Sequence, residues 1–169
     1  NRRYDEAQSL SSDEYVGLSF SDSYVDNHTY SNMSLHLFSQ DDASTGYYAD
    51  VASGISKANQ IIVDLGGDAA KPNVIAPARA MRAFFHFILM DSYGDIPILD
   101  HLAEANEVIE RQPRADVAKF IEKELLAIIP YLPSDNTQIT YGKPTKWMAE
   151  ALLVKLYINW PVYTATSVD

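Results

Sequence analysis

Residues 78–100 read ARAMRAFFHFILMDSYGDIPILD, and we expect the rest of the chain to be organised around this segment. Its apolar side chains recur at steps of three and four residues, which is the period of an α-helix. Gly94 can adopt the positive φ that ends a helix, and Pro97 cannot continue one. We therefore predict a central helix over residues 78–93, buried on most sides, with other helices packed around it. Its apolar stripe consists of Met81, Phe84, Phe85, Ile88 and Leu89, widened by Ala80, Ala83, Phe87 and Met90.

Two arginines, Arg79 and Arg82, interrupt this apolar helix. Long basic side chains on a buried helix can extend along its surface to reach water. Alternatively, Arg82 pairs with a carboxylate of the Gly94-Asp95 turn or of a neighbouring helix and holds the turn in place. Both interpretations give the arginines a structural role.

The same periodicity predicts three further helices, over residues 47–66, 113–130 and 144–160. Helices of this length joined by loops are typical of antiparallel pairs, so the predicted fold class is all-α. We expect a single helical domain over residues 1–169.

Several side chains carry more local expectations. A short helix is predicted after Ser12-Asp13, because these residues can cap a helix N-terminus. A buried Asn59 is expected to hydrogen-bond the backbone of a loop. Trp147 and Trp160 are expected to pack in the core, because helical spacing alone accounts for them.

The longest predicted loop, residues 21–46, is rich in Ser, Asp, Asn, Tyr and His and has no sustained period. Loops of this length are often functional. Aromatic faces beside carboxylates and amides suit a sugar, whose C–H face stacks on a ring while its hydroxyls take hydrogen bonds. The alternative is a solvated loop whose tyrosines pack on the helices. The candidate ligand-binding residues are Tyr24, Asp26, Asn27, Tyr30, Asp41 and Asp42.

Composition excludes several functional classes. The formal net charge is −10 and the 13 basic residues are scattered, which argues against a nucleic-acid partner. The sequence contains no cysteine, so it offers no zinc–thiolate site, disulfide or cysteine nucleophile. No apolar run approaches the roughly 20 residues of a membrane-spanning helix.

Motifs for catalysis or cofactor binding are absent from the sequence. It has no HExxH, GxGxxG or GxSxG pattern. His28 and His36 could approach Asp41 and Asp42, but they lack the paired spacing of a metal site. We therefore expect no metal, no cofactor and no catalytic residue.

Three ordered motifs resemble the SusD/RagB family of glycan-binding lipoproteins from Bacteroidetes outer membranes. The first joins RAMRAFF at 79–85 to YGDIPI at 93–98. The second is RQPR at 111–114, followed by Phe120-Ile121 and a terminal Tyr131-Leu132-Pro133. The third is YGKPTK at 141–146, which opens a helix through AEALL at 149–153. The family usually shows Gly-Arg-x-Thr there, so Lys143 is a conservative departure. The resemblance covers roughly residues 45–169.

This resemblance implies a tetratricopeptide-like α-α superhelix with long loops. It further implies a non-catalytic protein that binds oligosaccharides or polysaccharides at the cell surface and passes them to a SusC-like TonB-dependent transporter. The chain is expected to be the N-terminal portion of a longer outer-membrane protein that carries a lipid anchor. Two alternatives remain: a helical protein–protein interaction scaffold without a sugar ligand, and a glycan-active enzyme.

Overall fold

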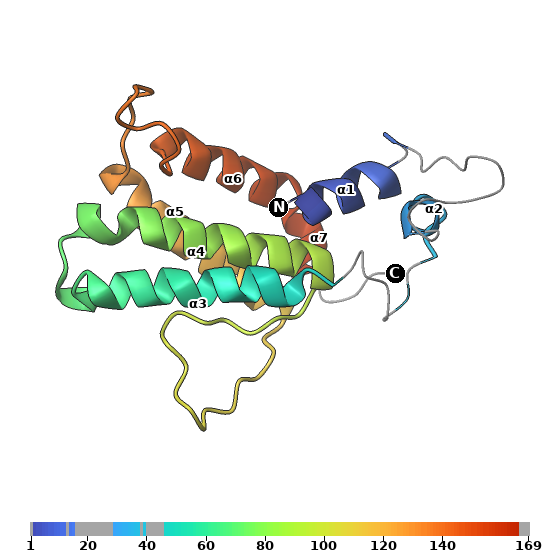
Figure 1. Cartoon of the computed structure of the whole chain (residues 1–169), viewed down its shortest axis with the longest axis horizontal. Coiled ribbons are helices and arrows are strands. Elements are labelled where there is room, and N and C mark those ends of the chain that lie inside the picture. Colours follow the sequence, from blue (N-terminus) through green and yellow to red (C-terminus); the bar gives the residue numbers. More distant parts are fainter. Residues whose placement is uncertain (1, 13, 16–28, 38, 40–45, 166–169) are drawn as a thin grey trace. The chain divides into compact units, whose positions relative to one another are not determined.

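The computed structural model describes residues 2–12, 14–15, 29–37, 39 and 46–165. Within these residues the regular structure consists of helices, and the one β-type pairing is an isolated bridge between Ile96 and Gln112 (Figure 1). The predicted all-α class is therefore confirmed. By their contacts the residues divide into two compact units, Asn1–Asp50 and Val51–Asp169.

The first unit contains α1 (Arg2–Ser11) and α2 (Thr29–Ser34), which pack against each other. Of the short helix predicted after Ser12-Asp13, Glu14 and Tyr15 are not helical, and the rest of the predicted segment lies outside the described residues. The predicted 21–46 loop also contains α2. A helix of six residues with a mostly polar sequence is too short to show a period.

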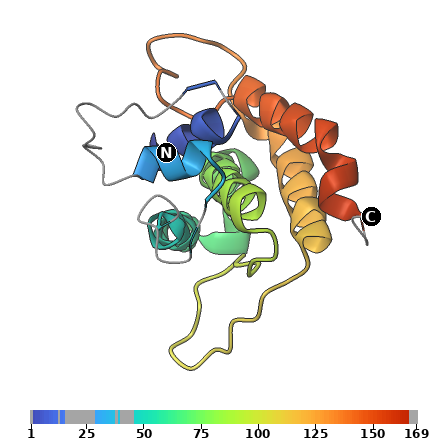
Figure 2. The same ribbon diagram turned by 90° about the vertical axis from the view of Figure 1, so that its right-hand side faces the viewer.

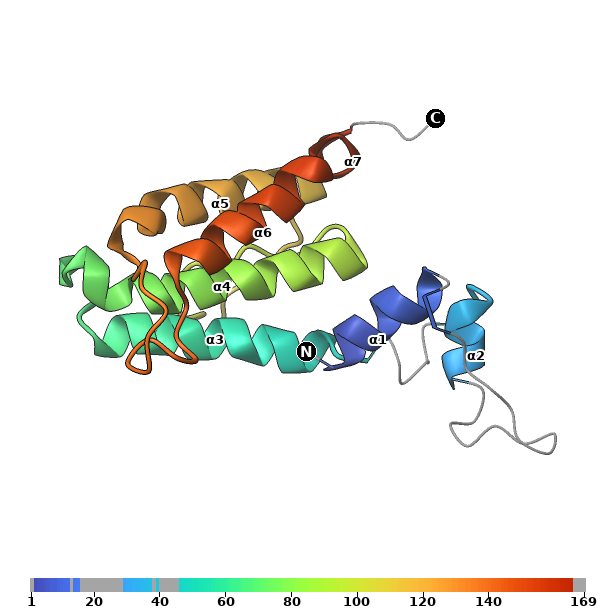
Figure 3. The ribbon, with the colours of Figure 1, turned by 90° about the horizontal axis from the view of Figure 1, so that it is seen from above.

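The second unit contains most of α3 (Tyr48–Asp64) and all of α4 (Pro72–Tyr93), α5 (Arg114–Ile128), α6 (Lys146–Ile158) and α7 (Trp160–Thr164). Two short 3-10 helices, η1 (Gly67–Ala69) and η2 (Ile129–Tyr131), follow α3 and α5. Successive long helices run antiparallel, α3 beside α4 and α5 beside α6 (Figures 1 and 3). These are the helix pairs that the periodicity predicts.

The central helix α4 is longer than predicted at its N-terminus. It begins at Pro72 rather than at residue 78, so residues 72–77 are helical instead of a linker. Pro72 fits the first helical turn because its missing N–H would have no partner there. Pro77 lies inside the helix and removes one intrahelical hydrogen bond near its start. The C-terminus agrees with the prediction, since Gly94 ends the helix at a φ of 75°.

Small residues of α4 face its neighbours. Ala76, Ala80 and Ala83 are fully buried, and α4 packs mainly against α5. The predicted stripe is only partly correct, because Ile88 and Leu89 are buried whereas Met81, Phe84 and Phe85 are half-buried. Alanines allow helices to approach closely, and Met81, Phe84 and Phe85 lie at the flank of the contact.

Phe85 lies on the α3 side of α4. A Cβ added at Gly54 of α3 would lie 2.8 Å from the Phe85 ring, so only glycine leaves room for the ring there.

Trp147, predicted in the core, is 54% exposed, while its indole N–H donates to the Ser134 carbonyl at 2.7 Å. Trp160 is half-buried against Tyr157.

The α4–α5 loop (residues 94–113) extends away from the helices it connects (Figure 2). Its two ends are joined by the Ile96–Gln112 bridge, in which the Gln112 N–H donates to the Ile96 carbonyl at 2.9 Å. The Asp95 carboxylate accepts from the backbone N–H of Arg114 at 2.8 Å, at the start of α5.

No helix in the described segments is long and apolar enough to cross a membrane.

Candidate functional site

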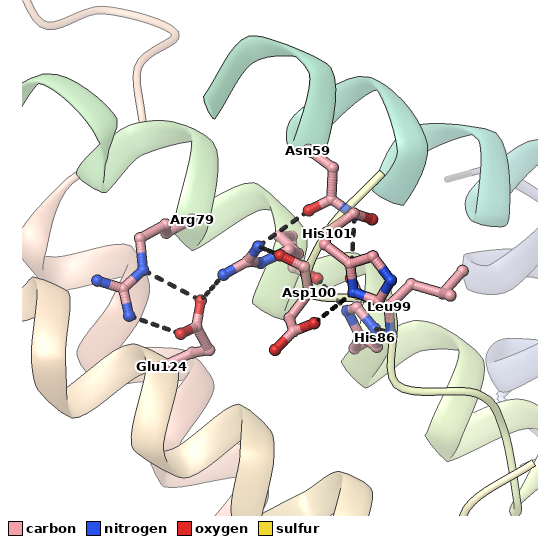
Figure 4. A network of polar contacts seen from close by, with 8 residues as sticks. Asn59, Arg79, His86, Leu99, Asp100, His101 and Glu124 are labelled. Atoms are coloured by element: carbon pink, nitrogen blue, oxygen red, sulfur yellow. Dashed lines mark hydrogen bonds and ion pairs between the residues drawn. The ribbon is translucent and has the colours of Figure 1, made fainter. Parts of the chain in front are cut away.

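A buried polar network lies where α3, α4 and α5 meet the α4–α5 loop (Figure 4). At its centre is Arg82 on α4, which is 6% exposed. Its Nη2 donates to Oε2 of Glu124 on α5 at 2.6 Å, and its Nη1 donates to Oδ1 of Asn59 on α3 at 2.9 Å. The same Nη1 also donates to the carbonyl of Asp100 in the loop. Arg82 thus connects two helices and the loop to α4.

Arg79, one turn before Arg82, shares the same carboxylate. Its Nη2 donates to Oε1 of Glu124 at 2.5 Å and its Nε donates to Oε2 at 3.2 Å. Burial raises the pKa of Glu124, but the hydrogen bond of Arg79 and the charge of Arg82 outweigh burial, so the pKa lies below its ordinary value. Glu124 is therefore ionised and pairs with both guanidinium groups, offsetting one of their two positive charges. Of the two interpretations of Arg82, pairing with a neighbouring helix is the one that the structure shows.

Asn59 holds the backbone of the α4–α5 loop. Its Nδ2 donates to the carbonyl of Leu99 at 3.1 Å and to that of His101 at 2.6 Å. The prediction that a buried Asn59 hydrogen-bonds a loop backbone is confirmed. Since Arg82 takes the Asp100 carbonyl between them, the loop backbone is held at Leu99, Asp100 and His101 by side chains of α3 and α4.

His86, the next α4 residue on this face, completes the contact. Its Nε2 accepts the backbone N–H of Leu99 at 3.1 Å, which requires the neutral ring with its proton on Nδ1. Nδ1 then donates to the Arg82 carbonyl at 2.8 Å. Burial, above all, lowers the pKa of His86 from 6.5 to about 4. The ring edge contacts Phe120, with centroids 5.0 Å apart.

The buried His86 makes stability depend on pH. Its folded pKa of about 4 lies below the 6.5 of an unfolded histidine, so between these values the unfolded state binds the extra proton. Stability should be highest above pH 6.5 and fall by up to about 3 kcal/mol as the pH drops to 4. Urea unfolding at successive pH values measures this slope.

The matched variant is His86→Gln, whose side chain can still accept the Leu99 N–H but does not titrate. Its stability should change less than that of the parent between pH 6.5 and 4. Equal slopes in parent and variant would show that another group titrates in this range.

The outer part of the α4–α5 loop has its own polar contacts. The exposed His101 ring bonds Asp100 Oδ1 at 2.8 Å and Glu107 Oε1 at 2.9 Å. Hydrogen bonds that the ring donates to these carboxylates raise the pKa of His101. The second Glu107 oxygen accepts the backbone N–H of Glu104 at 3.0 Å. Beyond this contact the side chain of Val108 is 81% exposed. The loop therefore presents acidic and apolar groups outward from a fixed base.

The polar groups of the network bind one another and the loop backbone. Among buried side-chain atoms of the described residues, Arg82 Nε is the one without a hydrogen-bond partner. The described residues include no group of three or more His, Asp or Glu placed to hold a metal ion. The arrangement is suited to fixing a loop rather than to moving a proton on a substrate.

A groove of about 360 Å³ lies between α3 and α4 in the second unit. Its lining is almost entirely apolar and includes Gly54, Ala58 and Ile61 of α3, Met81 and Phe85 of α4, and Pro144. Lys57 supplies the one charged side chain in the lining. Phe85, at the flank of the α4 packing surface, forms part of its wall.

Most predicted sugar-binding residues lie outside the described part of the chain. These are Tyr24, Asp26, Asn27, Asp41 and Asp42, and His28 lies outside it as well. Tyr30 lies on α2, where its hydroxyl donates to Glu6 Oε1 at 3.4 Å. His36 bonds the Ser11 carbonyl at 2.8 Å through Nε2. The structure therefore leaves the sugar site in residues 21–46 a prediction.

Sequence reasoning missed the roles of Glu124 and His86. For Glu124 the sequence did contain a signal, which was its position in the helix. It shares the apolar face of the helix with Ile121, Leu125 and Ile128. A carboxylate on such a face is expected to have a buried cationic partner.

Comparison with known proteins gives a consistent result. The family model for SusD-like proteins, described as "Starch-binding associating with outer membrane", matches residues 3–158. A SusD-like protein of Bacteroides ovatus is 28% identical over 121 residues, which is 69% of this chain and 22% of that protein. SusD-like protein P2 of Formosa agariphila is 33% identical over 112 residues, 62% of this chain and 22% of that protein. The chain thus spans about a fifth of the length of these relatives.

Solved structures agree on the fold. A laminarin binding SusD-like protein matches 95% of this chain and 35% of its own, with a TM-score of 0.78 at 22% identity. A SusD-like carbohydrate binding protein of Bacteroides fragilis matches 95% of this chain and 37% of its own, with a TM-score of 0.69 at 19% identity.

Proposed function

The chain belongs to the SusD-like family of carbohydrate-binding proteins associated with the outer membrane, and from this we propose that it is part of a non-catalytic glycan receptor at the cell surface. The observation that carries the proposal is the family match over residues 3–158. The receptor would bind oligosaccharides or polysaccharides and deliver them to a SusC-like TonB-dependent transporter.

The chemistry of the described residues supports binding rather than catalysis. His86 and Glu124 lie in the interior with lowered pKa values, and both are engaged in contacts that hold a loop. Catalytic acids and bases need access to a substrate, and these two side chains are 0% and 6% exposed. A rigid scaffold that fixes its loops suits a receptor, since less freedom is lost when a ligand binds.

We further propose that the 169 residues form the N-terminal portion of a longer protein. The two curated relatives are each matched over 22% of their length. The full-length protein would be a surface-exposed lipoprotein of the outer membrane, with the lipid anchor and the transporter contact as properties of the whole. Part of the glycan surface would then come from outside these residues.

We propose Tyr24 and Tyr30, with Asp26, Asn27, Asp41 and Asp42, as glycan contacts. Replacing Tyr24 or Tyr30 with alanine in the full-length protein should weaken glycan binding by about 1 to 3 kcal/mol, because a sugar face loses its aromatic partner. Titration calorimetry measures the change. Tyr141→Ala is the control, since this 81% exposed tyrosine lies in the second unit. Unchanged affinity in both Tyr24 and Tyr30 variants would move the site out of residues 21–46.

The proposed function is tested on the full-length protein with a panel of polysaccharides that includes starch and laminarin. Binding without release of reducing sugar supports the receptor. Release of reducing sugar would identify a glycan-active enzyme instead. Absence of both, with a control SusD-like protein active in the same panel, would favour a protein–protein interaction scaffold.

A further inference from the structure

Helix α6 carries apolar side chains on two opposite faces. Its inner face consists of Ala149, Leu152, Leu153 and Leu156, which are 0–7% exposed and pack on the rest of the second unit. A surface helix normally has polar residues on the opposite face. In α6 the opposite face is also apolar.

The outer stripe of α6 consists of Trp147, Ala151, Val154 and Ile158. Trp147 is 54% exposed, Val154 56% and Ile158 74%. Their spacing of four, three and four residues is that of a helix–helix seam, and the four positions fall within about 60° of the helix circumference. A seam of this kind normally faces another helix.

Helix α5, in the same unit, shows how an outward face normally looks. Its exposed residues include Asp116, Lys119 and Lys123, and Asp116 pairs with Lys119 at 3.1 Å. The one large apolar side chain among them is Leu126, which is 53% exposed and is followed by the smaller, exposed Ala127. A large apolar residue that stands singly among charges needs no partner. The contrast singles out α6, since its outer stripe is continuous over the length of the helix.

Opposite charges flank the two edges of the outer stripe. Glu150 lies on one edge and pairs with Lys146 at 3.5 Å, while Lys155 lies on the other edge and is exposed. Charges beside an apolar seam set which helix docks and in which orientation. The arrangement suits an amphipathic helix with an acidic residue opposite Lys155.

We propose that a further amphipathic helix of the same polypeptide, from outside these 169 residues, covers the outer stripe of α6 in the full-length protein. The length of the relatives supports this occupant, because the matched structures contain about two thirds of their residues outside the matched region. Helix α6 then lies between two layers of helices, which explains its apolar residues on both faces. The inference concerns the assembly of the protein and is independent of any glycan.

Thiol labelling tests this directly, since residues 1–169 contain no cysteine. Val154→Cys and Leu126→Cys are introduced separately into full-length protein whose other thiols are blocked or absent. The two wild-type side chains are 56% and 53% exposed in the described structure, so they form a matched pair. A maleimide should label Val154→Cys at least tenfold more slowly than Leu126→Cys. Equal labelling rates would overturn the proposal.

A second pair of variants distinguishes coverage of the outer stripe by the same polypeptide from coverage by a second copy of the protein. Val154→Glu should lower the melting temperature of the full-length protein by several degrees, whereas Leu126→Glu should leave it nearly unchanged. Light scattering should give the same monomer mass for Val154→Glu and for the parent. An oligomeric parent that Val154→Glu dissociates into monomers would overturn the proposal in favour of a second copy at this face.

Discussion

Glu124→Ala should lower the free energy of unfolding by about 3 to 5 kcal/mol, because it leaves the buried Arg82 guanidinium without its carboxylate. Arg82 is 6% exposed, and its Nη2 lies 2.6 Å from Glu124 Oε2. Arg79, which donates twice to the same carboxylate, also loses its partner. Urea unfolding measured by circular dichroism at neutral pH gives the change.

The control for this variant is Glu150→Ala, which removes a partly exposed carboxylate 3.5 Å from Lys146 on α6. Exposed pairs of this kind contribute about 0.3 to 0.5 kcal/mol, so this variant should unfold nearly like the parent. A loss below about 1 kcal/mol for Glu124→Ala would mean that the two arginines reach water when the carboxylate is removed.

Phe87→Ala is the second variant with a large expected effect, about 3 to 5 kcal/mol, through lost burial and the cavity left behind. Phe87 is 3% exposed, and its ring meets Tyr163 of α7 edge-on with centroids 6.4 Å apart. Urea unfolding again measures the loss.

Phe84→Ala is the matched comparison, because Phe84 lies on the same helix but is only half-buried. Its loss of stability should be clearly smaller than that of Phe87→Ala. The reverse order would show that α4 faces its neighbours with a different side from the one described.

The glycine that ends α4 and the hydrogen-bonding role of Asn59 were the features that the sequence predicted best. Gly94 ends α4 at a positive φ, as predicted. This prediction needed only local information, because glycine adopts this region without the strain that a Cβ causes. Asn59 was predictable for a similar reason, since a buried amide must find partners.

The orientation of α4 could not be predicted from periodicity. A helix with apolar residues on several faces gives no single stripe, so the bulky Phe84 and Phe85 appeared more central than the buried Ala80 and Ala83. Close packing against α5 depends on small side chains, which carry little weight in a hydrophobicity pattern. The exposed Trp147 was wrongly placed in the core because α6, like α4, carries apolar residues on more than one face.

The candidate site was likewise predictable only in part. Sequence indicated that Arg82 could pair with a neighbouring helix, but it could not select Glu124, which lies 42 residues away along the chain. Only the tertiary arrangement of α4 and α5 brings the two together. The sugar-binding prediction for residues 21–46 stays a prediction, with Tyr30 on α2 as the one member of its residue set within the described structure.

Buried side chains of α3 and α4 hold the α4–α5 loop at Leu99, Asp100 and His101. Amide hydrogen exchange measured by NMR reports on this anchoring, because the Leu99 N–H donates to His86 Nε2. We expect the Leu99 amide to exchange about two orders of magnitude more slowly than the amide of Val108 in the outer part of the loop, and to lose much of this protection in Asn59→Ala. A Leu99 amide that exchanges as fast as that of Val108 in the unmodified protein would contradict this anchoring.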